Sequence, residues 1–430
     1  MNRLAGVHRW VSGILGLVLL SSIAIGTPIE LAAKDSRLVE SGIQSPYAVV
    51  SSRIPYVVLV CYGICNCNGF LELVALRLRR SCFLMLMFVF AVVAMVASLC
   101  HTSHGVGDVI AMSVDILKYP AYLFVLPLLV SSFARTSAVA FVPAVLFVGA
   151  VTSLLALFAQ AEVGQVGIDT RLAFGMVKTF SAKHCMGIFA VASLVLSISR
   201  IHRARLLVLS FSALVCVVGS YFTGTRGFLL FLLVFAAVVS FPILLRSKGF
   251  VLSSMGFVVM IFFVSLFTFF GGGSFVNANL YERFLRDDFL TRRGRLWQGY
   301  ARHLCDNPID MLLGIPVNDP VREYIGLPAH NWFLGIVTHH GIIALVLLVV
   351  VVCGCLCRLL LLMRTSTTGL ARVGAAIVIA AFSWGMVENT LFLNAGLLPM
   401  TAFGVLGVAW MKSDEILFRR DRDVREYADG

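Results

Sequence analysis

Three short polar segments of this chain, each beside an apolar run, carry the residue types that could do chemistry. The first is Tyr221-Phe-Thr-Gly-Thr-Arg-Gly227, which comes directly before an apolar run. A helix that starts here presents free N–H groups and its positive dipole end, which together favour anions. Gly224 and Gly227 permit close backbone approach, and Arg226 adds a full charge. The segment predicts an anion site, although an arginine at a membrane border can also simply extend to the surface.

The second segment, from Gly271 to Asn331, is rich in arginine. It holds seven arginines, no lysine and seven acids, so it is neutral overall. Arginine presents a planar fork that binds phosphate or carboxylate oxygens in pairs, which a lysine cannot do. The preference for arginine over lysine predicts recognition of an anion. The alternative is that the arginines pair with the acids of the same segment. The arginines are Arg283, Arg286, Arg292, Arg293, Arg295, Arg302 and Arg322.

A helical pattern lies within the second segment, between residues 281 and 305. Arg293, Trp297, Tyr300 and Leu304 follow one another at spacings of four, three and four, so they share one helix face. Asn307-Pro308 predicts the end of the helix. The face either lies on the membrane surface, with its aromatic rings at headgroup level, or packs against the rest of the protein.

The third segment is Pro328-Ala-His-Asn-Trp332, at the start of another apolar run. His330 is a candidate general base. An isolated histidine at such a border more often serves as a hydrogen-bonding residue. The two arginine-bearing segments predicted on the same side of the membrane favour the catalytic interpretation.

Metal chemistry is not indicated by the residue spacing. The loop near residues 30–53 has no Asp-x-Asp pair, and no carboxylate or cysteine completes a metal site around His101 and His104. The Cys-x-Cys pairs do not share a helix face. We therefore expect neither a metal ion nor a cofactor.

The elements that must position these segments are apolar helices. Of the 430 residues, 59% are hydrophobic and 13% charged, where a soluble domain has about half and about a quarter. Apolar stretches of about 20 residues predict an all-α polytopic membrane protein and exclude a barrel. We expect twelve spans. They cover residues 9–29, 54–76, 81–100, 108–132, 136–158, 182–199, 205–222, 226–245, 250–270, 332–357, 370–387 and 395–411.

The basic residues predict the orientation of these spans. The net charge is +12, but it is spread over short gaps instead of one patch, so we expect no nucleic acid partner. With both termini in the cytoplasm, cytoplasmic segments carry 19 of the 34 basic residues. The chain then divides into spans 1–9 (residues 1–270), one long periplasmic loop (271–331), spans 10–12 (332–411) and a cytoplasmic tail (412–430).

Taken in order, these segments resemble the O-antigen ligase and polymerase superfamily of bacterial envelope glycosyltransferases. The matching residues are Thr-Gly-Thr-Arg-Gly at 223–227, Arg293 four residues before Trp297, Asn307-Pro308 followed by Gly314, and Ala-His-Asn at 329–331. The resemblance covers roughly residues 180–400. The cluster "TRRGR" departs from the usual pattern, so the motif arginine is Arg292, Arg293 or Arg295, and the spacing to Trp297 favours Arg293.

The resemblance implies transfer of a glycan from undecaprenyl diphosphate to an acceptor hydroxyl, at the periplasmic face of the bacterial inner membrane. Arg226 and Arg293 would stabilise the departing diphosphate, and His330 would act as the base. The reaction would need no metal and would invert the anomeric carbon. The residues expected to bind substrate are Arg292, Arg295, Asn331, Trp297, Gly224 and Gly227.

Several activities remain open at this point. A ligase joins the finished glycan to the lipid A core, whereas a polymerase joins glycan repeats. The single long loop favours the ligase, and a pilin-glycosylating relative is a further alternative. A lipid-linked glycan flippase or a secondary transporter would be expected to carry charged residues at mid-membrane depth, and this chain places nearly all of its charges at span ends and in loops.

Overall fold

We describe the fold on a computed structural model. It covers residues 2–28, 46–65, 89–93, 96, 119–162, 178–197, 203–223, 225, 227–244, 293–315, 331–365, 369–387 and 396–411. At some helix ends, Arg293 and Arg295 among them, only the backbone is described. Of the interpretable residues, 94% are helical, so the predicted helical class is confirmed.

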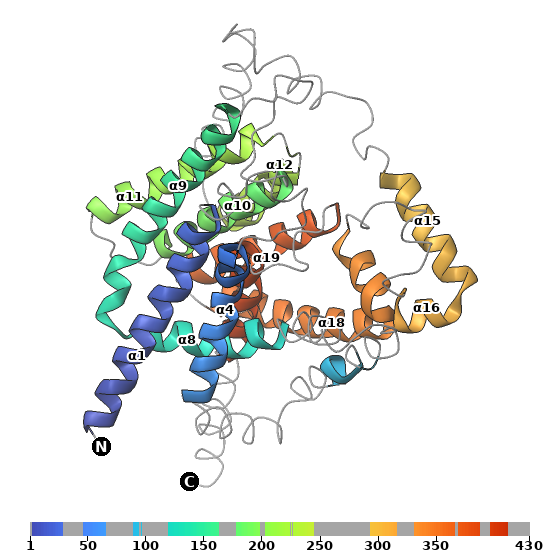
Figure 1. Cartoon of the computed structure of the whole chain (residues 1–430), viewed down its shortest axis with the longest axis horizontal. Coiled ribbons are helices and arrows are strands. Elements are labelled where there is room, and N and C mark those ends of the chain that lie inside the picture. Colours follow the sequence, from blue (N-terminus) through green and yellow to red (C-terminus); the bar gives the residue numbers. More distant parts are fainter. Residues whose placement is uncertain are drawn as a thin grey trace, which may run out of the picture.

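In the described parts of the chain one helix follows another (Figure 1). Short π- or 3₁₀-helical turns extend three of them: η1 (Ser22–Gly26), η2 (Ala121–Val125) and η3 (Ser137–Phe141). The α-helices are α1 (Asn2–Ser21), α4 (Pro46–Cys65), α8 (Leu126–Phe133), α9 (Val142–Glu162), α10 (Lys178–Leu196), α11 (Arg203–Phe222), α12 (Gly227–Leu244), α15 (Arg293–Asp306), α16 (Pro308–Leu313), α18 (Trp332–Thr365) and α19 (Gly369–Gly385). A last apolar helix covers Leu397–Met411.

Three of the described helices are long and apolar enough to cross a membrane: Ser137–Leu157, Arg203–Phe222 and Trp332–Met363. Seven shorter apolar helices coincide with other predicted spans. The predicted span at 250–270 and most of the one at 81–100 lie outside the described residues. The total of twelve spans, the long loop and the division of the chain at 270, 331 and 411 therefore stay predictions.

The outer faces of the helices are apolar. Leu207 on α11 is 70% exposed, Phe141 before α9 is 60% exposed, and Leu155 on α9 is 62% exposed. Exposed large apolar side chains on successive helices mark a surface that contacts something other than water. These faces fit contact with lipid, which agrees with the helix lengths.

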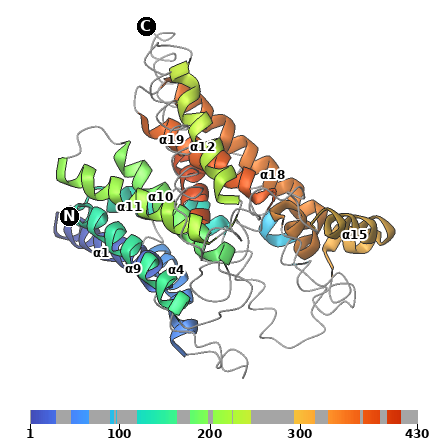
Figure 2. The same ribbon diagram turned by 90° about the horizontal axis from the view of Figure 1, so that it is seen from above.

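Small residues let the helix backbones of the bundle approach closely. A Cβ atom at Gly187 of α10 would lie 2.7 Å from the Leu398 nitrogen, and one at Gly149 of α9 would lie 2.8 Å from the Ala24 carbonyl oxygen. Close packing through small residues is typical of helices in a membrane, where no hydrophobic effect drives helices together. Figure 2 shows the resulting arrangement, with α12, α18 and α19 side by side.

Helix α18 is broken at Gly341, whereas the sequence predicted one continuous span at 332–357. Gly341 has φ 81° and ψ 169°, a conformation that side chains with a Cβ rarely adopt. A Cβ atom there would also overlap the Leu312 carbonyl of α16. The Ile315 N–H donates to the Thr338 carbonyl at 2.8 Å, just before the break. The chain after α16 therefore supplies a backbone hydrogen bond where the helical pattern of α18 is interrupted.

Candidate functional site

The first polar segment ends where α12 begins. The Thr223 hydroxyl donates to the Ser220 carbonyl at 2.6 Å and lies 2.8 Å from the Thr225 hydroxyl, which must therefore be the donor to Thr223. Both threonines are buried. Gly224 and Arg226 lie outside the described residues. The described part is thus a hydrogen-bonded pair of buried threonines that comes shortly before α12 in the chain.

Gly227 opens α12 and packs on Trp384, near the end of α19. A Cβ atom at Gly227 would overlap the indole nitrogen of Trp384 and lie 2.7 Å from its Cε2 atom. The indole is fully buried and meets the Phe231 ring edge to face at 6.1 Å. Only a glycine fits at this contact, so close approach to Trp384 explains the residue type at 227 without any ligand.

Asn331 joins the start of α18 to the end of α19. Its side-chain oxygen accepts the Leu334 N–H at 3.0 Å, which caps α18, and its side-chain nitrogen donates to the Met386 carbonyl at 2.7 Å. Both ends of the amide are therefore used within the fold. His330, the preceding residue, lies outside the described residues, and a substrate contact of Asn331 stays a prediction.

Trp332 anchors this end of α18 in the core. Its indole N–H donates to the Tyr119 hydroxyl at 3.3 Å, and its ring packs edge to face on Phe382 at 5.1 Å. Tyr119 in turn packs on Phe403 at 5.2 Å. Because Trp332 is fully buried, the backbone of the third polar segment is fixed where it enters the bundle.

Helix α15 forms part of the second polar segment and packs against the first half of α18. Tyr300 and Leu304 are buried in one small cluster with Ile315 and Val337. Of the two interpretations of this face, packing against the protein therefore holds for Tyr300 and Leu304. The helix ends at Asp306 and α16 starts at Pro308, so the predicted end at Asn307-Pro308 is confirmed.

The structure describes only some of the candidate residues on and beside α15. Trp297 is half-buried on α15. Arg293 and Arg295 lie on the first turn of the same helix, but their side chains fall outside the described part of the chain. Arg292 lies outside it entirely. Which of the three is the motif arginine therefore stays a prediction.

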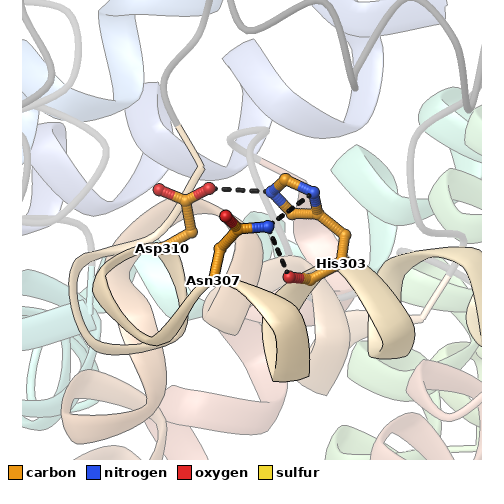
Figure 3. A network of polar contacts seen from close by, with 3 residues as sticks. All are labelled: His303, Asn307 and Asp310. Carbon is orange, nitrogen blue, oxygen red and sulfur yellow. Dashed lines mark hydrogen bonds and ion pairs between the residues drawn. The ribbon is translucent and has the colours of Figure 1, made fainter.

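A polar network closes the corner between α15 and α16 (Figure 3). The Asn307 amide donates to the His303 carbonyl at 3.0 Å and lies 3.3 Å from the His303 Nδ1 atom. With Nδ1 as acceptor, the imidazole carries its proton on Nε2 and donates it to the Asp310 carboxylate at 2.7 Å. Sequence reasoning missed this network, although the spacings of four and three along one helical corner could have indicated it.

One described residue from each of the polar segments at 223–227 and 328–332 contacts the end of α19. Gly227 touches Trp384 and Asn331 bonds to Met386, two residues further along the chain. The start of α12, the start of α18 and the end of α19 therefore lie at one end of the bundle, as the predicted parity of the spans requires. Helix α15 packs a short distance along α18 from this point, as Figure 1 shows.

The described residues contain no group of three histidines, cysteines or acids that could hold a metal ion. Since much of the segment 271–331 falls outside the described residues, metal-independent chemistry stays a prediction.

No protein-family model matches the chain, and no curated protein is significantly similar to it in sequence.

Proposed function

We propose that the protein is a membrane glycosyltransferase that moves a glycan from undecaprenyl diphosphate to an acceptor hydroxyl. The observation that carries the proposal is that Gly227 and Asn331, from two separate polar segments, each contact the end of α19, at Trp384 and at Met386. Helix α15, from the second polar segment, packs on α18. Residues that bear chemistry and are far apart in sequence but share one end of a bundle are what an active site requires.

The proposed reaction needs side chains in two roles, stabilisation of the leaving group and removal of a proton. The diphosphate leaves with its bonding electrons, and Arg226 and Arg293 stabilise the negative charge that develops on it. His330 removes the proton of the acceptor hydroxyl as that oxygen forms the new glycosidic bond. One displacement of this kind inverts the anomeric carbon. A diphosphate is already a good leaving group, so the reaction uses neither nucleotide nor metal.

The preferred acceptor is the lipid A core, which makes the protein an O-antigen ligase of the bacterial inner membrane with its site in the periplasm and its termini in the cytoplasm. The single long loop predicted between spans 9 and 10 favours the ligase over an O-antigen or exopolysaccharide polymerase. A deletion strain separates the two activities. Accumulated lipid-linked polymer without ligation indicates a ligase, and core carrying a single repeat indicates a polymerase.

The break in α18 bears on the alternative of a transporter or flippase. Discontinuous helices in transporters leave backbone groups free to bind substrates and ions. Here the Thr338 carbonyl accepts the Ile315 N–H, and Leu312 of α16 covers Gly341. The break is thus used for packing α16 against α18, which supports the enzyme over the transporter.

Transfer by the purified full-length protein tests the proposal. In detergent, with lipid-linked glycan donor, acceptor, excess EDTA and no nucleotide, we expect product to form. The matched control is Arg226→Ala at equal protein concentration, which should form far less product. Activity that chelation abolishes and a divalent ion restores would refute the metal-independent mechanism, and absence of transfer to any glycan acceptor would refute the function.

A further inference from the structure

Helix α16 turns two large apolar side chains away from the protein. Ile309 is 70% exposed and Leu312 is 43% exposed. They are three residues apart, so they share one face of the helix. The two residues between them point the other way, because Asp310 bonds to His303 of α15 and Met311 packs in the small cluster between α15 and α18. The outward face of α16 is therefore apolar, and the inward face accounts for its packing.

Backbone contacts fix α16 against α18 at the break in that helix. The Leu312 carbonyl occupies the place that a Cβ atom at Gly341 would need. Just after α16, the Ile315 N–H donates to the Thr338 carbonyl at 2.8 Å. Because these contacts are made by the backbone, α16 cannot rotate to bury its outward side chains without losing them. The exposure of Ile309 and Leu312 therefore follows from how the helix is held.

The outward face of α16 adjoins the lipid-facing side of α18. Helix α18 is long and apolar enough to cross a membrane. After the break, Ile343, Val346 and Val350 are all exposed, and their spacings of three and four place them on one face. This face begins two residues after Gly341, which the Leu312 carbonyl contacts. The apolar side of α16 thus lies within about one helical turn of the surface that α18 presents to lipid.

The residues where α15 ends and α16 begins are polar. Arg302, Asp306 and Asn307 are all exposed there. A polar border next to large apolar side chains is typical of a helix at a membrane surface, where the polar groups stay in water. Two apolar side chains are too few for a stable protein interface, which buries about 800 Å² on each partner. The bilayer beside α18 is the partner that fits so small an apolar face.

We propose that α16 is a membrane-surface anchor, with Ile309 and Leu312 inserted among the upper acyl chains of the phospholipid leaflet beside α18. Helix α16 contains no basic residue, so the contact is apolar and does not depend on the type of headgroup. Because α15 bonds to α16 through His303 and Asp310, the anchor also keeps α15 close to the membrane. This interaction is independent of the proposed transferase activity.

Depth-resolved fluorescence quenching of the full-length protein in lipid nanodiscs tests the anchor. An environment-sensitive fluorescent amino acid replaces Ile309 in one variant. In the matched control it replaces Gln298, which is exposed on α15 about half a turn from the buried Tyr300. Lipids with a nitroxide near the top of the acyl chain should quench the fluorophore at 309, and dissolved iodide should quench it little. At 298 we expect the opposite pattern. Strong quenching by iodide at 309 would overturn the proposal.

A second copy of the chain is the other partner that could cover this face. In nanodiscs that hold one copy each, lipid quenching at 309 should persist, because no second copy is present. Protection of the fluorophore from both iodide and nitroxide lipids would show that protein covers Ile309, and the anchor would then be wrong.

Ile309→Asp should loosen α16 in nanodiscs, because a carboxylate is costly to place among acyl chains. Amide hydrogen exchange of residues 308–313 should speed up about tenfold to a hundredfold, the range expected when one large apolar side chain is no longer buried. Gln298→Asp is the matched control, since it adds the same charge on α15 and should leave exchange in α16 unchanged. Exchange in Ile309→Asp at the wild-type rate would contradict the anchor.

Discussion

The start of α12 and the corner between α15 and α16 differ in whether their polar side chains have hydrogen-bond partners. At the corner, His303 bonds to both Asp310 and Asn307. At the start of α12, the buried Trp384 indole has no acceptor among the described residues. A satisfied network stabilises a fold, whereas a buried donor without an acceptor costs stability. The corner between α15 and α16 therefore stabilises the fold, whereas the buried Trp384 indole gains no hydrogen bond from the described residues.

The largest expected effect is at His330, beside the capping residue Asn331. His330→Ala should lower turnover by about 10² to 10⁴, the loss expected for a general base, while donor affinity and Tm stay close to wild type. Single-turnover rates and equilibrium binding of undecaprenyl diphosphate measure the two separately. Normal turnover, or a loss of affinity as large as that of Arg226→Ala, would contradict the assignment of His330 as the base.

Gly227→Ala should have the next largest effect, and it should lower both stability and donor binding. The added methyl group overlaps the Trp384 indole, and such overpacking costs about 1 to 3 kcal/mol. Thermal unfolding and donor titration measure the two effects.

Gly354→Ala in α18 is the matched control, because no atom lies within 4 Å of the added methyl group. Its Tm should stay equal or rise slightly, since alanine favours a helix. Equal behaviour of the two variants would show that the contact between α12 and α19 is looser than described.

The smallest expected effect is at the corner. Asp310→Ala should lower the free energy of unfolding by about 1 kcal/mol, the usual worth of a hydrogen bond, without changing donor affinity. The exposed Asp306 provides the control, and Asp306→Ala should change stability by less than about 0.5 kcal/mol. A loss of donor affinity in Asp310→Ala at unchanged stability would show that the corner between α15 and α16 takes part in donor binding. The corner would then not differ from the start of α12 in the way described.

Local signals in the sequence were sufficient to predict several features of the fold. Apolar runs predicted the helices, and Asn307-Pro308 predicted the boundary between α15 and α16, because proline is disfavoured inside a helix but fits its first turn. The spacing of Tyr300 and Leu304 predicted a shared face, and the structure shows this face packed on α18.

Features that depend on tertiary contacts could not be predicted in this way. Gly341 follows Thr338-His339-His340 within one predicted span, and the approach of Leu312 accounts for the break there. Trp384 is one more aromatic residue in an apolar helix until Gly227, more than 150 residues earlier in the chain, is placed against its nitrogen. In both cases the contact partner lies far away in the sequence, so local spacing could not identify it.

The break at Gly341 also sets the depth at which the two parts of α18 can lie. Residues 342–365 after the break form a rod of about 36 Å at 1.5 Å per residue, which exceeds the hydrocarbon thickness of about 30 Å. This part alone can cross a bilayer, so the short part at 332–340 is not needed for crossing. It can therefore lie at the level of the phospholipid headgroups, where the charged end of a polyprenyl lipid is found and where a water-soluble acceptor can reach it.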